Sequence, residues 1–228
     1  MENKKENNMS QARQAYNNGD YEKAHAIWLI QAEDGNPEAQ AWLGSLYANG
    51  EGVDTDDKNA LSWYEKAAEQ GNSMAQANVG AMYYMGQGTS KNVDKAIKWL
   101  SAAAENGDVN GLFNLAVIYT KGEEVDKNLE RAAELYQQAS EQGHYPSQSR
   151  LGYMYAHGQG VKKDRIKAYL WLSLAAQHGI GTALNELESI VKSMSAEEKA
   201  MGATLSEQWR NKTGANNMQV AMQPTPSN

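Results

Sequence analysis

The sequence predicts an all-α solenoid, a stack of antiparallel helix pairs, and two observations support this prediction. First, residues 39–71 form a pattern that the chain repeats at a fixed offset of 36 residues without a gap. Second, each copy contains two segments whose apolar residues have helical spacing. A fixed period of about 20 to 50 residues is typical of proteins whose copies stack on one another and share a continuous core.

The copies share leucine or valine, glycine, tyrosine and alanine at matching positions. These are Leu43, Val79, Leu115 and Leu151; Gly44, Gly80, Ala116 and Gly152; Tyr47, Tyr83, Tyr119 and Tyr155; Gly50, Gly86, Gly122 and Gly158; and Ala60, Ala96, Ala132 and Ala168. Because the phase holds through four copies, we assign 37–180 to four repeats of 36 residues.

Taken in order, the chain begins with a polar segment at 1–8, which lacks helical periodicity and is predicted to be a disordered tail. Residues 9–36 form a shorter helix-turn-helix, the opening repeat. In the four repeats that follow, the first helix carries Leu43 and Tyr47 on one face, and the second carries Ala60 and Ala67.

Glycine and short polar residues are expected to end and begin these helices. Gly50 and its copies follow the first helix, where a left-handed C-terminal cap costs a glycine little. The residue four positions before the helix alanine has a side-chain oxygen that can accept from free N–H groups of the next helix. These expected N-caps are Asp56, Asn92, Asn128 and Asp164.

Gly44, Gly80 and Gly152 lie inside a predicted helix, where glycine costs about 1 kcal/mol relative to alanine. We interpret them as points of close approach, where helices pack backbone to backbone. Large side chains at one repeat position are expected to fill the space between successive repeats, namely Trp63, Trp99, Leu135 and Trp171. On this interpretation, Trp99→Ala costs about 3–5 kcal/mol.

The chain ends with a half-repeat and a capping helix over 181–210. Ser195 and Glu198 have the spacing of a capping box at the start of the last helix. Met201, Leu205 and Trp209 share one face of that helix, which is expected to cover the open end of the stack. Residues 211–228 are predicted to be a second disordered tail.

Composition excludes several classes of protein. The net charge of −7 and the pI near 5.2 argue against binding to nucleic acid or anionic membranes. No apolar run approaches the ~18 residues of a membrane span. The chain has no cysteine, and its first residues do not form a signal peptide. A cytoplasmic location is expected, with a periplasmic or secreted location as the alternative if a signal was removed.

No segment predicts catalysis, a cofactor or a metal site. The loop from Gly86 to Lys91 lacks the full spacing of a phosphate-binding loop and follows no strand. The acidic group at 54–57 lacks the glycine and distal glutamate of a calcium loop. The four histidines are spread over several copies, without the spacing of a zinc motif. We therefore predict no catalytic, cofactor-binding or metal-binding residues.

The string from Leu43 to Gly71 resembles the SEL-one-like repeat (SLR), a relative of the tetratricopeptide repeat, and the resemblance extends over 39–193. Residues 9–35 are more similar to an ordinary tetratricopeptide repeat. The third copy departs from the pattern, with Ala116 for glycine and Glu123-Glu124 in its loop. The resemblance implies a right-handed superhelix of helix pairs that serves as a scaffold for protein–protein contacts, often in bacterial envelope, signalling or host-interaction settings.

Because first helices line the concave side of such a stack, their remaining side chains are expected to face a groove that binds a protein or peptide. Asparagine can donate to and accept from a peptide backbone, and aromatic residues, methionine and arginine are enriched at interfaces. The candidate groove residues are Trp42, Ser45, Asn49, Asn78, Tyr84, Met85, Asn114, Lys121, Arg150, Tyr153 and His157. The asparagines could instead bond neighbouring repeats.

The prediction is thus a monomeric, non-enzymatic adaptor whose partner is a protein or peptide of unknown identity. The alternative is an envelope-associated hydrolase or a glycan-binding protein on the same scaffold. An active site would bring titratable residues together in a pocket, whereas a recognition groove would spread its residues over several repeats.

Overall fold

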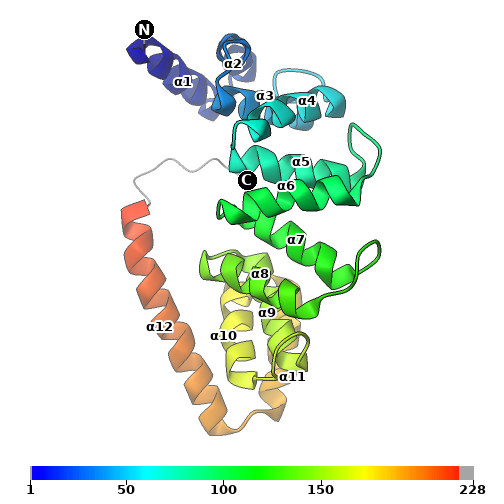
Figure 1. Cartoon of the computed structure of the whole chain (residues 1–228). Helices are drawn as coiled ribbons and strands as arrows, with labels where there is room; N and C mark the ends of the chain where they lie inside the picture. Colours follow the sequence, from blue (N-terminus) through cyan, green and yellow to red (C-terminus); the bar gives the residue numbers. More distant parts are fainter. Residues whose placement is uncertain (1, 221–228) are drawn as a thin grey trace. The chain divides into compact units, whose positions relative to one another are not determined.

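The computed structural model describes residues 2–220, with side chains from residue 8 to residue 213, and all regular structure in this range is helical (Figure 1). Its helices are α1 (Glu2–Asn17), α2 (Tyr21–Glu33), α3 (Pro37–Asn49), α4 (Asp57–Glu69), α5 (Ser73–Met85), α6 (Val93–Glu105), α7 (Val109–Lys121), α8 (Leu129–Glu141), α9 (Tyr145–His157), α10 (Arg165–Gln177), α11 (Gly181–Ser193) and α12 (Ala196–Val220). The predicted all-α fold is confirmed.

The chain divides into two compact units, and each is described by itself. Unit 1 comprises Met1–Ile118 with Glu123–Val125, and unit 2 comprises Tyr119–Gly122 with Asp126–Asn228. Unit 1 therefore holds α1 to α6 and most of α7. In it, α1 packs on α2, α3 on α4 and α5 on α6; in unit 2, α9 packs on both α8 and α10, and α12 packs on α10.

The predicted helix boundaries agree with the structure. Gly50 has a left-handed backbone with φ 71°, and its N–H donates to the carbonyl oxygen of Leu46. Each second helix begins at the expected cap. Asp56 Oδ1, for example, accepts from the backbone N–H groups of Lys58 and Asn59, both at 3.0 Å. Every repeat thus satisfies part of its free helix-end N–H groups with its own sequence.

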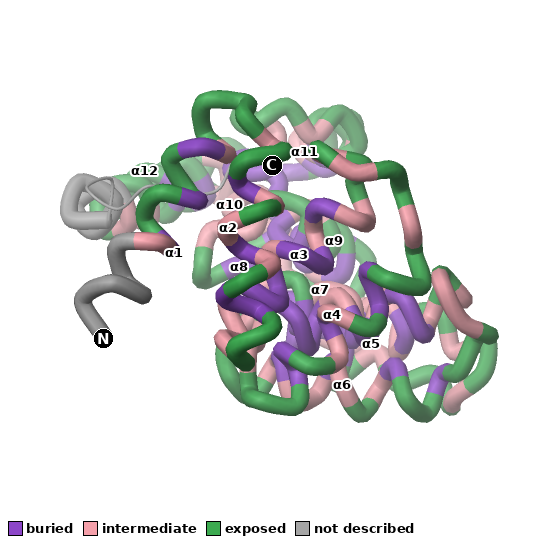
Figure 2. The backbone as a smooth tube through the Cα atoms, turned by 90° about the horizontal axis from the view of Figure 1, so that it is seen from above, coloured by how far each residue is buried: buried purple, intermediate pink, exposed green. Residues whose placement is uncertain are grey.

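The core of each unit consists of small and aliphatic residues at the repeat positions, and Figure 2 shows these buried stretches alternating with exposed ones along the helices. Gly80 does mark a close approach. A Cβ atom placed there would lie 2.6 Å from Cγ of Leu100, and one placed at Gly152 would lie 2.6 Å from Cγ of Leu172. The side chain opposite each glycine is therefore the residue after the tryptophan position. Backbone atoms of the second helix also come close, because Ala96 O lies 3.1 Å from the Cβ position of Gly80 and Leu172 N lies 3.0 Å from that of Gly152.

The tryptophan position itself differs from the prediction. Trp63 and Trp99 are only half-buried, and lysine ammonium groups lie over their rings, with Lys66 at 3.8 Å and Lys98 at 5.4 Å from the ring centroids. Trp171 is buried, with 3% of its surface exposed. Because Trp99 is only partly buried, we expect Trp99→Ala to cost less than the ~3–5 kcal/mol of a fully buried aromatic ring.

Two expectations about the ends also change. Residues 2–8, predicted as a disordered tail, form the first turns of α1, and the second predicted tail, 211–228, is helical up to Val220. Extending an existing helix costs far less than starting one, so polar sequence can continue a helix that a packed segment has nucleated. Residue 1 and residues 221–228 of the two predicted tails lie outside the described residues.

The capping box of α12 is confirmed, because Ser195 N–H donates to Glu198 Oε2 at 2.8 Å and Glu198 N–H donates to Ser195 Oγ at 3.1 Å. The predicted packing face of α12 is wrong in part. Met201 and Leu205 remain 49% and 37% exposed. Trp209 does pack, on Trp171, with 4.9 Å between the ring centroids.

Candidate functional site

The eleven candidate groove residues, here called the ladder, lie on first helices in both units. Unit 1 holds Trp42, Ser45 and Asn49 on α3, Asn78, Tyr84 and Met85 on α5, and Asn114 on α7; unit 2 holds Lys121 at the end of α7 and Arg150, Tyr153 and His157 on α9. The structure thus gives two shorter ladders, one in each unit.

Trp42, the first ladder residue of unit 1, is part of the core. Trp42 stacks on Trp28, with ring centroids 4.7 Å apart and planes within 3° of each other, and Trp28 is fully buried. Tyr16 also packs on Trp42, at 5.1 Å between centroids. Trp42 therefore joins α1, α2 and α3, and only its half-exposed edge can meet a partner.

The ladder residues Asn78 and Asn114 have side-chain amide groups. Asn78 is half-buried on α5, and its Nδ2 donates to the carbonyl oxygen of Met74 at 3.0 Å, so its Oδ1 has no partner in the described part of the chain. Asn114 occupies the same repeat position on α7, is also half-buried, and has no side-chain hydrogen bond to a described residue. Neither asparagine bonds a neighbouring repeat.

Other ladder residues of unit 1 lie at the C-terminal ends of the first helices α3 and α5. Met85, at the end of α5, has 62% of its surface exposed. Next to it, the Tyr84 ring lies beneath the ammonium of Lys91, 5.1 Å from the ring centroid. At the equivalent end of α3, the amide of Asn49 donates to Ser45 Oγ at 3.4 Å. The ends of α3 and α5 therefore carry both an apolar side chain, Met85, and polar groups.

The ladder of unit 2 combines an exposed cation with aromatic rings. Arg150 is exposed and forms no ion pair with any residue from 8 to 213. Tyr153 is 41% exposed, and its ring lies 4.3 Å from that of His157 between centroids. His157 Nε2 lies 2.9 Å from Glu186 Oε1 on α11. This contact holds the His157 ring beside Tyr153.

Perturbed pKa values occur mainly in the core. Burial raises the pKa of Tyr64 to about 12, and burial together with a hydrogen bond to Glu51 raises that of Tyr16 to about 12. Burial lowers the pKa of His25 and of His144. None of these groups belongs to the ladder, and within residues 8–213 no group of three or more His, Asp or Glu residues could hold a metal ion.

Sequence reasoning missed two cavities in unit 2. They lie along α10 and are lined by residues of α8, α9, α10 and α12 and of the loop before α10, and none of the lining residues belongs to the ladder. The signal that could have indicated one of them is the run Lys162-Lys163-Asp164-Arg165-Ile166-Lys167, four cations among six residues of an acidic protein. None of the helices in residues 2–220 is long and apolar enough to span a membrane.

Comparison with known proteins agrees with this geometry. A family model of the Sel1 repeat, the SEL-one-like repeat that the sequence resembles, matches residues 37–72, 73–108, 109–144 and 146–180. A comparison with curated proteins found no match.

Solved structures share the fold. The chain is similar to c5321, a protective antigen present in uropathogenic Escherichia coli strains, with 32% identity and a TM-score of 0.78 over 90% of this chain and 45% of that one. A Sel1 repeat protein from Oxalobacter formigenes is 35% identical, with a TM-score of 0.68 over 75% and 49% of the two chains. The chain thus spans about half the length of both.

An immunity protein from Pseudomonas aeruginosa is 22% identical, with a TM-score of 0.53 over 88% of this chain and 80% of that one, which shows a shared fold. The stronger result is that the family model matches more than half of the chain, one repeat after another. The chain therefore belongs to the Sel1 repeat family.

Proposed function

We propose that this chain is a non-enzymatic scaffold that binds a protein or peptide through the ladder on its first helices. Sel1 repeat proteins generally mediate protein–protein interactions, and the family is typically a non-catalytic repeat scaffold. The bacterial sources of the similar structures support a bacterial setting, in signalling, at the envelope or in contact with a host. We further propose that the chain is a monomer.

The amide groups of Asn78 and Asn114, which are only partly used or unused within the described chain, carry this proposal. They recur at one position of successive repeats in unit 1, are half-exposed, and have hydrogen-bonding capacity that the described chain does not use. A half-buried amide without a partner is costly unless water or a ligand satisfies it. An extended peptide offers alternating N–H and C=O groups, which match the donor and acceptor of a carboxamide.

Met85 supports the same surface. Methionine adapts its shape to varied partners and is enriched at interfaces, and Met85 is 62% exposed at the end of the helix that carries Asn78. The competing explanation for the asparagines, bonding between repeats, is not supported, because the side-chain hydrogen bond that Asn78 forms within the described residues stays in its own helix. The hydrolase or glycan-binding alternative stays a prediction that no feature of the ladder favours.

The test is in-cell crosslinking with mass spectrometry, comparing the native chain with a double variant, Asn78→Ala and Asn114→Ala. The matched control is Ser62→Ala with Glu105→Ala, two exposed residues on the second helices α4 and α6 of the same unit. We expect one protein to be captured by the native chain and the control but lost with the ladder variant. Equal capture by all three would show that binding does not use the ladder.

A further inference from the structure

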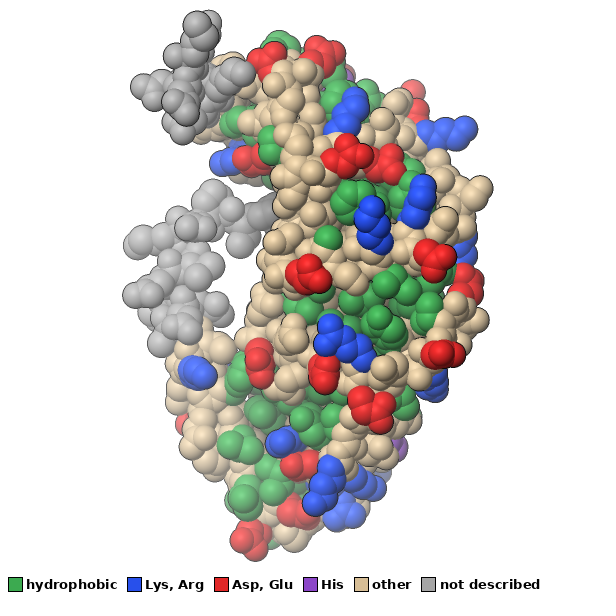
Figure 3. Space-filling view, viewed as in Figure 1, with side chains coloured by type: hydrophobic (Ala, Val, Ile, Leu, Met, Phe, Trp, Pro, Cys, Tyr) green, Lys and Arg blue, Asp and Glu red, His purple; other side chains and the backbone are tan. Residues whose placement is uncertain are grey.

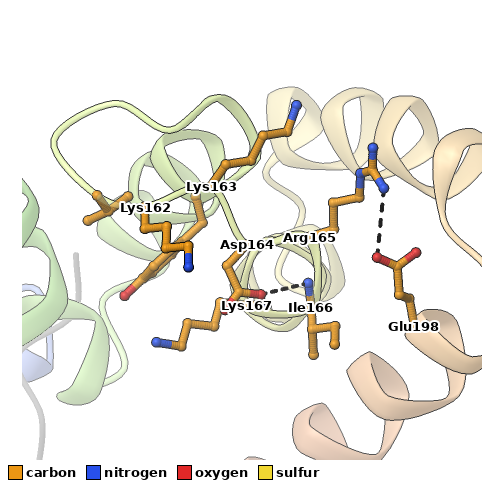
Figure 4. A pocket seen from close by; sticks show the side chains of 9 residues that line it. Lys162, Lys163, Asp164, Arg165, Ile166, Lys167 and Glu198 are labelled. Atoms are coloured by element: carbon orange, nitrogen blue, oxygen red, sulfur yellow. Dashed lines mark hydrogen bonds and ion pairs between the residues drawn. The ribbon is translucent and has the colours of Figure 1, made fainter.

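Two cavities on unit 2 adjoin each other along α10, and we call them together the α10 groove. The first, of about 800 Å³, is lined by the loop before α10, by the first turn of that helix and by Glu198 of α12 (Figure 4). The second, of about 650 Å³, is lined by α8, α10 and Leu205 of α12. They share Tyr155, Val161 and Lys167, so a single ligand can occupy both.

The first cavity is basic. Lys162, Lys163, Arg165 and Lys167 line it. Arg165 points toward Glu198, 3.7 Å away, whereas Lys162 and Lys163 are exposed and have no ion pair within residues 8–213 (Figure 4). The chain as a whole has a net charge of −7, so this concentration of cations departs from the general surface.

The acidic residues of this cavity are already engaged. Asp164 Oδ1 accepts from the backbone N–H groups of Ile166 and Lys167, both at 3.0 Å, and so caps α10. Glu198 Oε2 accepts from the N–H of Ser195 at 2.8 Å in the capping box of α12. The ammonium groups of Lys162 and Lys163 are therefore left to attract an external anion.

The second cavity is largely apolar. Its apolar lining residues include Trp171, which is 3% exposed, Ala133, Leu170, and Leu205, which is 37% exposed. Figure 3 shows apolar side chains over this part of unit 2, with lysine and arginine side chains among them. Apolar surface of this kind beside unpaired cations is typical of a binding surface.

The position of α12 explains why the second cavity is open. The helix approaches α10 closely at Gly202, where a Cβ atom would lie 2.7 Å from the Tyr169 ring. Ser206 Oγ lies 2.8 Å from Ser173 Oγ in a buried hydrogen bond. These contacts fix which face of α12 meets α10, and Leu205 falls at the edge of that face, where it lines the groove without being covered.

We propose that the α10 groove binds an extended acidic peptide segment of a partner protein, with carboxylates at Lys162 and Lys163 and one bulky apolar side chain against Trp171 and Leu205. The observation that carries it is that a basic cavity, in which Lys162 and Lys163 have no ion pair within residues 8–213, shares three lining residues with an apolar one. This goes beyond the proposed function, because no residue that lines the groove belongs to the ladder.

Charge selects a peptide over other anionic ligands. Glu130 and Glu134 line the apolar end, so a ligand with negative charge along its whole length, such as a nucleic acid strand, would be repelled there. A peptide can place its acidic residues at one end only. The terminal residues 221–228 of this chain contain no aspartate or glutamate, so they do not supply such a segment.

The first experiment is a display selection of random peptides of about twelve residues on the immobilised full chain, counter-selected against a variant carrying Lys162→Glu and Lys163→Glu. We expect the enriched peptides to combine aspartate or glutamate with a nearby leucine, phenylalanine or other bulky apolar residue. Enrichment of peptides without acidic residues, or no enrichment over the variant, would overturn the proposal.

The second experiment measures the affinity of one enriched, fluorescently labelled peptide by polarisation. We expect Lys162→Glu with Lys163→Glu to weaken binding about ten-fold or more, and added salt to weaken binding to the native chain. The charge-matched control is Lys23→Glu with Lys58→Glu, two exposed lysines of unit 1, which should bind as the native chain does. Equal weakening in the control would show an effect of net charge alone.

The apolar end has a matched pair on one helix. Leu205→Ser should weaken binding several-fold, whereas Met201→Ser, 49% exposed on α12 and outside the lining of both cavities, should not. Unchanged circular dichroism and melting temperatures show that each variant is folded. If Leu205→Ser, while folded, binds as the native chain does, the peptide does not occupy the apolar cavity and the proposal fails.

Two further measurements separate this proposal from its alternatives. The Asn78→Ala, Asn114→Ala variant should bind the selected peptide as the native chain does. The ladder proposal and the α10-groove proposal can therefore fail independently of each other. Sedimentation velocity tests a second copy of the chain as the occupant. A native dimer that Lys162→Glu with Lys163→Glu converts to a monomer would overturn the peptide proposal in favour of self-association.

Discussion

The two units differ at the junctions between successive helix pairs, where a buried glutamine of a first helix bonds to neighbouring helices. We call these junctions corners. In unit 1, the Gln40 amide donates to the carbonyl oxygen of Ala32 at 3.1 Å and accepts from Gln70 Nε2 at 2.8 Å. One repeat later, Gln76 donates to Ala68 at 3.2 Å and accepts from Asn106 at 3.1 Å. Each of these buried glutamines thus uses both ends of its amide to link three helices.

In unit 2, the same glutamine is only half satisfied. Gln148 Nε2 donates to the carbonyl oxygen of Ser140 at 3.1 Å, but its Oε1 is buried and has no hydrogen-bond partner in the described part of the chain. The position that holds Gln70 and Asn106 in unit 1 holds His178 here. His178 stacks on Tyr145, with ring centroids 3.6 Å apart, and does not donate to Gln148.

A second histidine changes the cap before the same corner. Asn36 and Asn72 each accept a hydrogen bond from the third N–H of the following helix, both at 2.9 Å. In unit 2 this position is His144, whose Nδ1 instead lies 2.7 Å from Ser147 Oγ. The side chain of His144 gives α9 no cap hydrogen bond.

The comparison shows that the last repeat depends less on polar corners and more on its neighbour α12. Trp171 occupies the position of Trp63 and Trp99, yet it alone of these tryptophans is buried, because Trp209 of α12 covers it. A terminal repeat has no following copy to bury its outer face, so a helix outside the repeat pattern does this instead.

The largest expected effect tests this difference at one repeat position. Trp171→Ala should lower the free energy of unfolding by about 3–5 kcal/mol, as the loss of a buried aromatic ring does. Trp99→Ala, which removes a half-buried ring, should cost about 1–2 kcal/mol. Urea unfolding followed by far-ultraviolet circular dichroism measures both. Equal losses in the two variants would show that α12 does not change the role of this position.

A smaller effect tests the glutamine corners. Gln76→Leu removes two satisfied hydrogen bonds and should cost about 1–3 kcal/mol. Gln148→Leu should cost less than about 1 kcal/mol, because it also removes a buried oxygen that has no partner. Leucine fits this position in the third repeat, where Leu112 is 1% exposed. The same urea experiment applies, and a larger loss for Gln148→Leu would show that its Oε1 is satisfied in solution.

The sequence predicts features that recur and misses features that depend on one neighbour. The helix order, the caps such as Asp56 and the close approach at Gly80 follow from positions that repeat every 36 residues. The burial of Trp171 does not, because it depends on the angle at which α12 crosses α10. For the same reason, the sequence predicts the ladder positions but not the α10 groove, whose walls come from α8, α9, α10 and α12.

A third prediction introduces the asparagine N-cap of unit 1 at the equivalent position of unit 2. The double variant His144→Asn with Ser147→Ala copies the pair Asn72 and Ala75, so the new amide oxygen can accept from the N–H of residue 147. It should raise the free energy of unfolding by about 1 kcal/mol, the usual value of an N-cap. His144→Asn alone should gain less, because it leaves the buried Ser147 hydroxyl without its present partner.

The control for this prediction is the reverse change in unit 1, Asn72→His, which should lose stability by a similar amount. A double variant less stable than the native chain would mean that His144 stabilises α9 by packing more than an asparagine does by capping.

The smallest expected effect is a pH dependence located at the same corner. Burial lowers the pKa of His144 below its ordinary value of 6.5, so between the two values the unfolded chain binds more protons than the folded one. The contribution of His144 to stability is therefore complete above pH 6.5 and falls as the pH drops toward the folded pKa. The measurement is the urea midpoint at about pH 7.5 and about pH 5.5.

The His144→Asn, Ser147→Ala variant should lose less stability than the native chain across that interval, because it has no imidazole to protonate there. It should not become independent of pH, since burial also lowers the pKa of His25 in unit 1, where its Nε2 lies 3.4 Å from the Tyr47 hydroxyl. Adding His25→Gln should remove a further part of the loss. If the double variant loses as much as the native chain, protonation of His144 does not weaken this corner, and the acid sensitivity belongs to unit 1.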